Sequence, residues 1–299
     1  MLLSSAAMER AIARTRTAIV SATLLICAAG APGCKDQAKE SAKHAVEDAN
    51  TLADLVDKDV GEIERGLPEG AKTLGALYAK GADPKGDIPA VRSALLKTVR
   101  DVPDLNIAKS TFFALADDKG LGIRNNLEQD AMAGQDLMKL FPGIQKSVTD
   151  GTFVTTTGAF PGPPAANGPD KDWIATMPVK GDDGKVKGIF VTGWSYRRFA
   201  LHLQDTLKRE LQDALKKSGD TGKLPIFYIG VFDASGVYTE RQTPKVNEDA
   251  MAGLKLVEKT AAGPAQGTIN ITERDFGWAA KRTPKLGADT GIIVLRSEL

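Results

Sequence analysis

The sequence predicts an α+β fold in which a helical amino-terminal segment precedes two antiparallel-sheet units that are joined by a helix. Three observations support this fold class. Apolar residues recur at three- and four-residue steps over residues 35–64 and 198–217, as on the buried face of a helix. Short apolar runs bounded by Gly, Pro and Asp turns fill most of the remaining chain after residue 101. Motifs from the first half of this stretch return in the same order in the second half.

The composition excludes several functional classes. The 299 residues include 39 Lys and Arg against 38 Asp and Glu, whereas nucleic-acid-binding domains usually carry a strongly basic face. Two His and two Cys are too few for a zinc site, a Cys–His nucleophile pair or a disulfide framework. We therefore expect no metal site, no cofactor and no nucleic-acid partner.

Residues 1–33 are interpreted as a lipoprotein-type signal peptide. A basic stretch, which starts at either Met1 or Met8, leads into an apolar run over 18–29. This run is shorter than the 18 or so residues that are needed to span a bilayer. The segment is therefore expected to be removed after export rather than to belong to the fold.

The small residues that end this segment indicate a lipid anchor. Gly33 directly precedes Cys34, and the ending resembles the bacterial lipobox, in which the cysteine receives a diacylglycerol and becomes the new amino terminus. Ala31 departs from that pattern, because leucine is usual at this position. An ordinary secretory signal and a retained membrane anchor are the alternatives. We expect an exported chain, lipidated at Cys34 and held on the periplasmic side of a bacterial membrane or at the cell surface.

Residues 34–100 are expected to form a tether and a helical lead-in. The first helix, 35–64, should end at residues 66–68, because Gly-Leu-Pro combines two helix-breaking residues. A second helix over 69–80 and a third over 88–100 complete this segment.

Residues 101–197 form the first predicted sheet unit. A strand over 107–116 runs into an Asp-x-x-Gly turn at 117–120 and returns over 121–125. The remaining elements expected here are helical or irregular residues 127–150, a strand over 152–157, and a hairpin built from 173–179 and 188–196. A Pro- and Gly-rich loop at 160–170 precedes this hairpin.

A connecting helix, placed within residues 198–223, leads to a second unit over 224–299 that repeats the first. The Asp-x-x-Gly turn, a Trp-x-Ala strand, a proline and a Gly-led apolar strand recur at offsets of 116, 105, 106 and 103 residues. The repeated positions are Asp117 and Asp233, Trp173 and Trp278, Pro178 and Pro284, and Gly188 and Gly291. Offsets of similar size in constant order indicate a duplication.

This layout resembles the double Cache family, the PAS-like extracytoplasmic sensor domains of bacterial receptors. The resemblance is carried by residues 113–120, 173–179 and 183–189 for the membrane-distal unit and by 229–236 for the proximal unit. It implies a binding pocket in the first unit and a small polar ligand, such as an organic or amino acid. Cache receptors usually continue into a membrane helix and a signalling domain. Because no such segment follows here, we expect the signal to pass to a separate signalling or envelope protein.

Five residues are candidates for ligand contact. Trp194 and Tyr196 share one face of the strand over 188–196, and aromatic rings of this kind suit a small pocket. Arg197 follows directly, and a guanidinium can hold a carboxylate by two parallel hydrogen bonds. Trp173 and Arg124 are further candidates from the neighbouring strands. The alternative is that the tryptophans belong to the core and the arginines to the surface.

No enzyme motif is complete. Residues 193–197 begin like the nucleophile elbow Gly-x-Ser-x-Gly but lack its final glycine. The sequence thus predicts a lipid-anchored, non-catalytic sensory module that binds a small polar molecule. A structural or assembly lipoprotein that acts through protein–protein contact is the main alternative. A hydrolase that uses a carboxylate pair stays open as well, because such a pair needs only proximity in space.

Overall fold

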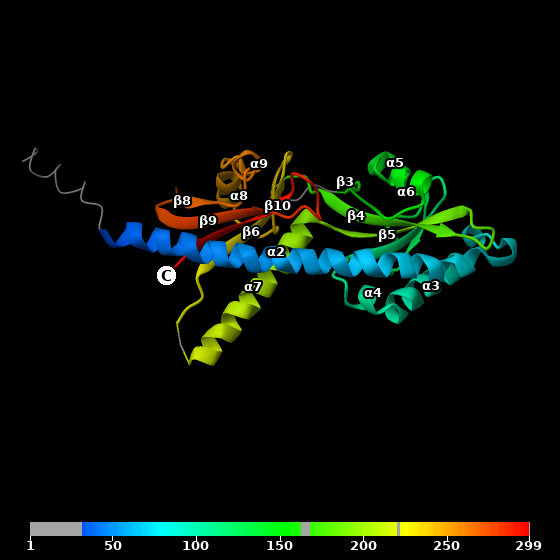
Figure 1. The fold of residues 1–299 in the computed structure, drawn as a ribbon, viewed down its shortest axis with the longest axis horizontal. Coiled ribbons are helices and arrows are strands. Elements are labelled where there is room, and N and C mark those ends of the chain that lie inside the picture. Colours follow the sequence, from blue (N-terminus) through cyan, green and yellow to red (C-terminus); the bar gives the residue numbers. More distant parts are fainter. Residues whose placement is uncertain (1–31, 163–167, 220–221, 299) are drawn as a thin grey trace, which may run out of the picture.

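The computed structural model describes residues 32–162, 168–219 and 222–298. A 43-residue helix, α2 (Pro32–Leu74), runs along most of the long axis, and both sheets lie against it (Figure 1). Its buried face repeats at three- and four-residue steps from Ala38 to Leu74, as the sequence predicts. The signal peptide predicted for residues 1–33 and the lipidation predicted at Cys34 fall outside the part of the chain whose side chains are described.

Helix α2 continues through residues 66–68, so the prediction that it ends there is wrong. Leu67 is fully buried in the main core, and its burial favours the helical conformation despite the following proline. A Cβ atom at Gly66 would lie 2.8 Å from Leu105 Cδ2. The glycine therefore allows close packing between α2 and the segment that carries Leu105. The predicted helix over 69–80 is the end of α2 followed by the 3₁₀ helix η1 (Gly75–Gly81).

Short helices surround the first sheet. The predicted strand over 107–116 begins only at Phe112, because Pro103 starts a short helix over the preceding residues. The helices of this region are η2 (Pro84–Gly86), α3 (Ile88–Asp101), α4 (Pro103–Ile107), α5 (Leu137–Leu140) and α6 (Ile144–Asp150). Helix α3 therefore confirms the helix predicted over 88–100.

The first sheet has five antiparallel strands in the order β2-β1-β5-β4-β3. The strands are β1 (Phe112–Asp117), β2 (Gly122–Asn125), β3 (Val154–Gly158), β4 (Asp172–Lys180) and β5 (Val186–Ser195). Alternate residues of β5 face opposite sides of the sheet: Phe190 and Trp194 pack toward α2, and Ile189 and Val191 toward α5 and α6. This alternation confirms the prediction for the strand as far as Ser195, but the placement of Tyr196 in the strand is wrong, because Tyr196 begins the helix that follows.

The second sheet repeats the first in topology. Its order is β7-β6-β10-β9-β8, which becomes the order of the first sheet when each strand is renumbered by position. The strands are β6 (Ile226–Asp233), β7 (Gly236–Thr239), β8 (Ala265–Ile271), β9 (Arg274–Arg282) and β10 (Gly291–Ser297). The turn aspartates end β1 and β6, and the repeated tryptophans lie in β4 and β9. The predicted fold class is confirmed; division at residues 34, 101, 198 and 224 stays a prediction.

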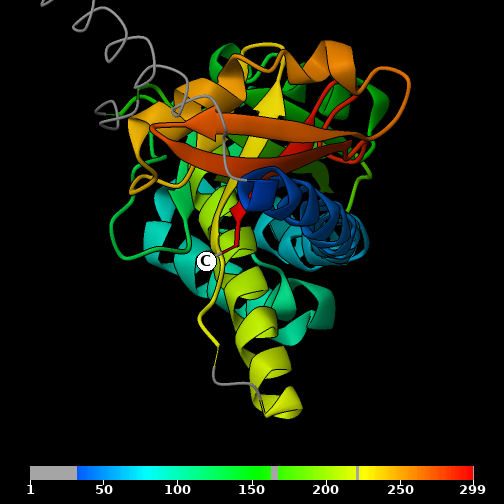
Figure 2. The ribbon, with the colours of Figure 1, turned by 90° about the vertical axis from the view of Figure 1, so that its left-hand side faces the viewer.

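Each sheet packs one face toward α2 and covers the other with short helices. One continuous core joins α2 to both sheets, and two smaller cores lie under α5 and α6 and under α8 (Lys245–Ala252) and α9 (Leu256–Lys259). Helix α7 (Tyr196–Ser218) connects the sheets, and its carboxyl-terminal half projects away from them (Figures 1 and 2). Among the described residues, no helix is long and apolar enough to cross a membrane.

Candidate functional site

The helix-covered face of the first sheet is filled by side chains. Phe112 of β1 meets Phe160 edge to face, with ring centroids 5.7 Å apart, and Phe141 lies 4.8 Å from the same ring. Ile144 of α6 and Ile174 of β4 are buried in the same cluster. On this face the described side chains of the first unit pack against one another. This packing does not support the binding pocket that is predicted for the first unit.

Trp173 and Trp194 lie on the opposite face, inside the main core. They are direct cross-strand partners, and their rings stack at 4.5 Å. Phe199 of α7 stacks on Trp194 at 4.4 Å, and neither tryptophan exposes more than 1% of its surface. This placement matches the alternative reading of both residues as core, and their role as ligand contacts stays a prediction.

Tyr196 and Arg197 begin α7 at the junction between the sheets. Tyr196 is fully buried and packs edge to face on Tyr238 of β7, and burial raises the pKa of its hydroxyl. Arg197 Nη1 lies 2.6 Å from Glu248 Oε2, Arg197 Nη2 lies 3.1 Å from Glu248 Oε1, and Nη1 also donates to the carbonyl oxygen of Thr239. The guanidinium that is predicted to bind a ligand carboxylate therefore holds a carboxylate of this chain.

Arg124 binds the loop that follows its own strand. Its Nη2 donates to the carbonyl oxygens of Leu127 and Glu128 at 2.8 and 3.2 Å. Its Nη1 lies 3.2 Å from Asp130 Oδ2. These contacts fix the conformation of residues 126–130, so the observed role of Arg124 is local and structural. The predicted site residues are thus spread over the core, the junction and this loop, and they do not converge on one cavity.

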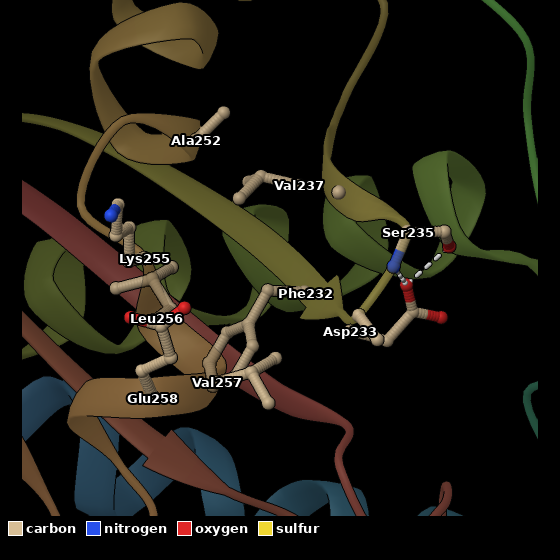
Figure 3. Close-up of a pocket in the computed structure, with 11 residues that line it drawn as sticks. Phe232, Asp233, Ser235, Val237, Ala252, Lys255, Leu256, Val257 and Glu258 are labelled. Carbon is tan, nitrogen blue, oxygen red and sulfur yellow. Dashed lines mark hydrogen bonds between the residues drawn. The ribbon is translucent and has the colours of Figure 1, made fainter.

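A hollow opens instead on the helix-covered face of the second sheet. We call it the α9 hollow; its volume is about 310 Å³, and it lies between the β6–β7 hairpin and the α8–α9 segment (Figure 3). Phe232 and Val237 on the sheet side and Leu256 and Val257 on the helix side supply apolar surface. Most known small-molecule sites are concave and mainly apolar, with a few polar groups at fixed positions. The α9 hollow has this composition.

Charged and hydroxyl groups lie along the edge of the α9 hollow. Lys255 and Glu258 are exposed, and within the described parts of the chain neither side chain forms an ion pair. Lys255 is a non-glycine residue in the left-handed region, at φ 53°, immediately before α9. Residues held in this sparsely populated region are often found at functional sites. The edge therefore offers one cation and one anion to a polar ligand beside an apolar surface.

Asp233 connects the α9 hollow to the first sheet unit. Its Oδ1 accepts the backbone N–H of Ser235 at 2.8 Å, which closes the turn after β6 (Figure 3). Its Oδ2 lies 2.5 Å from Nζ of Lys171, which directly precedes β4 of the first sheet. Lys171 Nζ also reaches Ser235 Oγ at 3.1 Å. Two residues that line the hollow are therefore held by a lysine of the other unit.

The sequence predicts Asp233 only as a turn residue and gives no signal for Lys255, Glu258 or Lys171. Lys255 lies in a segment with no recognisable motif, and its conformation becomes apparent only in the structure. The duplication was the available signal, because it places an Asp-x-x-Gly turn at corresponding edges of both sheets. Among the described residues, no group of three or more His, Cys, Asp or Glu side chains is placed to hold a metal ion.

No protein-family model matches the sequence, and no curated protein matches it. Solved structures with a similar fold do exist. The extracellular domain of vpHK1S-Z8, described as a histidine kinase, has a TM-score of 0.55 at 8% identity, over 88% of this chain and 93% of that one. A domain of a sensory box/GGDEF family protein from Vibrio parahaemolyticus has a TM-score of 0.54 at 9% identity, over 88% and 97%.

A third similar structure belongs to a longer protein. It is an extracellular ligand binding receptor from Desulfohalobium retbaense, with a TM-score of 0.48 at 12% identity over 85% of this chain. The present chain spans 40% of that receptor. At such identities the two structures with the higher TM-scores show the fold alone, which in this chain is a long amino-terminal helix with two five-stranded antiparallel sheets.

Proposed function

We propose that this chain is an extracytoplasmic sensory module that binds a small polar molecule in the α9 hollow and performs no catalysis. The observation that carries the proposal is the contact between Lys171 and Asp233, which connects the edge of the hollow to the first sheet unit. A ligand at this edge would touch a residue that already joins the two units. The likeness to the extracellular domain of a histidine kinase and to a sensory box protein supports a sensory role.

The ligand is a molecule of amino-acid or organic-acid size with one apolar portion. Phe232 and Val237 would contact the apolar portion, whereas Lys255 would attract a carboxylate. Glu258 would accept hydrogen bonds from an ammonium group. A hollow of about 310 Å³ is at the small end of known ligand sites, which favours a ligand of few heavy atoms.

Binding would act by shifting a conformational equilibrium. A ligand changes the populations of two states only when it binds one of them more tightly. In the structure Lys171 Nζ bonds both Asp233 and Ser235, and both of these residues line the hollow. A ligand that competes for either residue would favour the state in which this contact is broken, and a ligand that orders the turn would favour the contact.

The proposed lipid anchor would place the second sheet nearest the membrane. Cys34 belongs to the first turn of α2. The described ends of the chain adjoin, because the backbone N–H of Glu298 donates to Ser41 Oγ at 3.1 Å and Gln37 Nε2 donates to the carbonyl oxygen of Glu298 at 3.3 Å. An anchor at Cys34 would therefore hold the β8–β10 end of the molecule close to the bilayer and present the first sheet away from it.

Thermal unfolding of the purified chain against amino acids, organic acids and amines tests the proposal. A ligand at 100 times its Kd should stabilise the folded state by about 2.7 kcal/mol, or several degrees in the unfolding midpoint. Lys255→Glu reverses the charge at the edge of the hollow, and Val237→Trp fills its apolar part. Both variants should abolish the shift. For each compound that raises the unfolding midpoint, titration calorimetry then measures the Kd.

Two matched changes in the first unit serve as controls. Leu121→Trp alters the residue that follows the first turn glycine, as Val237 follows the second, and Leu121 is exposed. Lys139→Glu reverses an exposed lysine of α5. In both control variants the ligand should raise the unfolding midpoint as much as it does in the parent. The proposal fails if no compound stabilises the chain, or if Lys255→Glu and Val237→Trp bind every hit as tightly as the parent.

A second candidate function, assembly with an envelope protein, is favoured by one observation. The carboxyl-terminal half of α7 projects from the body, and residues 208–210 are exposed (Figure 2). A helix that extends beyond the core can present its free surface to a partner. A photo-crosslinking residue at Glu210 should then capture one defined protein in cells, whereas the same residue at Lys139 should capture none.

A further inference from the structure

A second cavity lies at the start of α7 and shares no lining residue with the α9 hollow. Its volume is about 390 Å³. Three residues of the first turns of α7 and three residues that follow β7 form its lining: Arg197, Arg198, Leu201, Glu240, Arg241 and Gln242. We call it the arginine cavity. Because its two walls come from α7 and from the chain after β7, a molecule inside it would touch both.

Two of the three arginines have no counter-charge. Arg198 and Arg241 are exposed, and across residues 32–162, 168–219 and 222–298 neither guanidinium forms an ion pair. Arg197 differs, because Glu248 Oε2 lies 2.6 Å from its Nη1. Glu240 also lines the cavity, and its Oε2 accepts the backbone N–H of Gln242 at 2.7 Å. The lining therefore carries an excess of positive charge.

The backbone donors at the start of α7 are already engaged. The N–H of Arg197 donates to Asp170 Oδ1 at 3.3 Å, and the N–H of Arg198 donates to Ser195 Oγ at 3.3 Å. A ligand in the cavity would thus be recognised by the guanidinium groups rather than by the end of the helix. A guanidinium presents its N–H donors in a planar fork that fits the oxygens of a carboxylate or a phosphate.

We propose that the arginine cavity binds a small anion, a carboxylate or a phosphate, between Arg198 and Arg241. The anion supplies the negative counter-charge for these two arginines. The cavity volume accommodates a small organic acid or an inorganic phosphate. This site is separate from the proposed sensory site in the α9 hollow and does not depend on it. Occupancy would link α7 to the chain after β7, beside the existing hydrogen bond from Arg197 to the carbonyl oxygen of Thr239 at the end of β7.

Calorimetry and thermal unfolding of the purified chain test this proposal with two probes, inorganic phosphate and succinate. Sodium chloride holds the ionic strength constant, so that general screening is the same in every sample. We expect saturable binding of at least one probe and a matching rise in the unfolding midpoint. Arg198→Gln and Arg241→Gln should each weaken binding by about tenfold or more, the size of one lost charge-assisted contact. The double variant should not bind.

Arg209→Gln is the matched control, because Arg209 lies on the same helix, does not line the cavity, and donates from Nη2 to Thr206 Oγ1 at 3.0 Å. It should bind as the parent does. Lys255→Glu should also retain anion binding, which separates this result from the fate of the sensory proposal. Binding of phosphate alone identifies an inorganic ligand, and binding of succinate identifies a carboxylate. The proposal is overturned if neither probe binds above chloride, or if the double variant binds as tightly as the parent.

Discussion

Arg197 and Glu248 form a bidentate ion pair that is almost completely buried at the junction of the two sheets. The Nη–Oε distances are 2.6 and 3.1 Å, and the side chains are 2% and 5% exposed. Burial acts to raise the pKa of Glu248, but hydrogen bonds from Arg197 and Thr239 outweigh it and hold the pKa below its ordinary value. The pair joins the first turn of α7 to α8, so it fixes the connecting helix to the second unit.

Replacing Glu248 with Gln should be strongly destabilising. The buried guanidinium of Arg197 would lose this counter-charge, and breaking one side of a buried ion pair costs about 3–5 kcal/mol. Urea unfolding at pH 7 measures the change. The double variant with Arg197→Met and Glu248→Met should lose less than Glu248→Gln alone, because no charge is left buried. A double variant that is less stable than the single one would contradict this account.

The control for this series is Lys245→Ala. It breaks the exposed ion pair of Lys245 and Asp249 on α8, the same helix that carries Glu248. Exposed pairs contribute about 0–1 kcal/mol, so the unfolding midpoint in urea should hardly move. A large loss in this control would mean that α8 itself, rather than the buried pair, is the sensitive element.

Asp172 should make the chain less stable as the pH rises. Burial, with a contribution from the nearby Asp170, raises the pKa of Asp172 to about 6, although the backbone N–H of Phe160 donates to its Oδ2 at 2.9 Å. The unfolded chain releases this proton near pH 4. Between about pH 4 and 6 the folded state therefore holds more protons, so stability falls as the pH rises through this window and stays lower above it.

The variant Asp172→Asn tests this sign. The pKa of Asp172 differs by about 2 between the folded and unfolded chain, which corresponds to about 3 kcal/mol in the free energy of unfolding. Because the carboxyl group is partly accessible to solvent, we expect an effect on the order of 1–3 kcal/mol. Asp172→Asn should be more stable than the parent at pH 8 by this amount, and the two should agree at pH 4 in urea unfolding. Asp150→Asn, at the exposed end of α6, should show no such divergence. An equal difference at both pH values would refute the raised pKa.

The fold class was predictable because it depends on local patterns. The turns at Asp117 and Asp233 are closed by hydrogen bonds within four residues, so a short motif is enough to mark them. The alternation along β5 also follows from neighbouring residues. Repetition of these patterns at a nearly constant offset then predicts two sheets of the same topology.

The α9 hollow and the contacts at the junction of the sheets were not predictable, because they depend on contacts between distant segments. Glu248 lies 51 residues from Arg197, and Asp233 lies 62 residues from Lys171, and no local pattern marks either pair. The end of α2 differs from the prediction for the same reason: Gly66 packs against Leu105, and this tertiary contact overrides the helix-ending signal of the local sequence. Propensity is a weak prior where burial decides.

Cys34 should carry the lipid that the sequence predicts. In bacteria fed an alkyne-tagged fatty acid, the full chain should become labelled and sediment with membranes. Cys34→Ser should abolish the label and release the protein from the membrane fraction, because two acyl chains are needed for stable anchoring. Cys27→Ser is the matched control and should stay labelled. A Cys34→Ser variant that is labelled like the parent would disprove lipidation at this position.

Gly277 should be the residue on which the docking of α2 depends. In the structure β9 approaches α2 so closely that a Cβ atom at Gly277 would lie 2.0 Å from the backbone N of Ala42 and 2.3 Å from the carbonyl carbon of Ser41. Both obstacles are backbone atoms of a helix, so they cannot move aside independently. Gly277→Ala should therefore push the start of α2 from the sheet and cost about 1–3 kcal/mol or more.

Hydrogen exchange locates this effect. Amides of α2 between Ala38 and Ala49 should lose protection in Gly277→Ala, whereas those around Gly70, where a Cβ atom would lie 2.6 Å from Phe190 Cε1 of the first sheet, should keep it. Gly86→Ala is the control, because a Cβ there would have no neighbour within 4 Å, and its stability should change by less than about 0.5 kcal/mol. Uniform loss of protection along α2 would mean that the helix docks as one unit. Unchanged exchange in Gly277→Ala would mean that the close approach does not hold α2 on the second sheet.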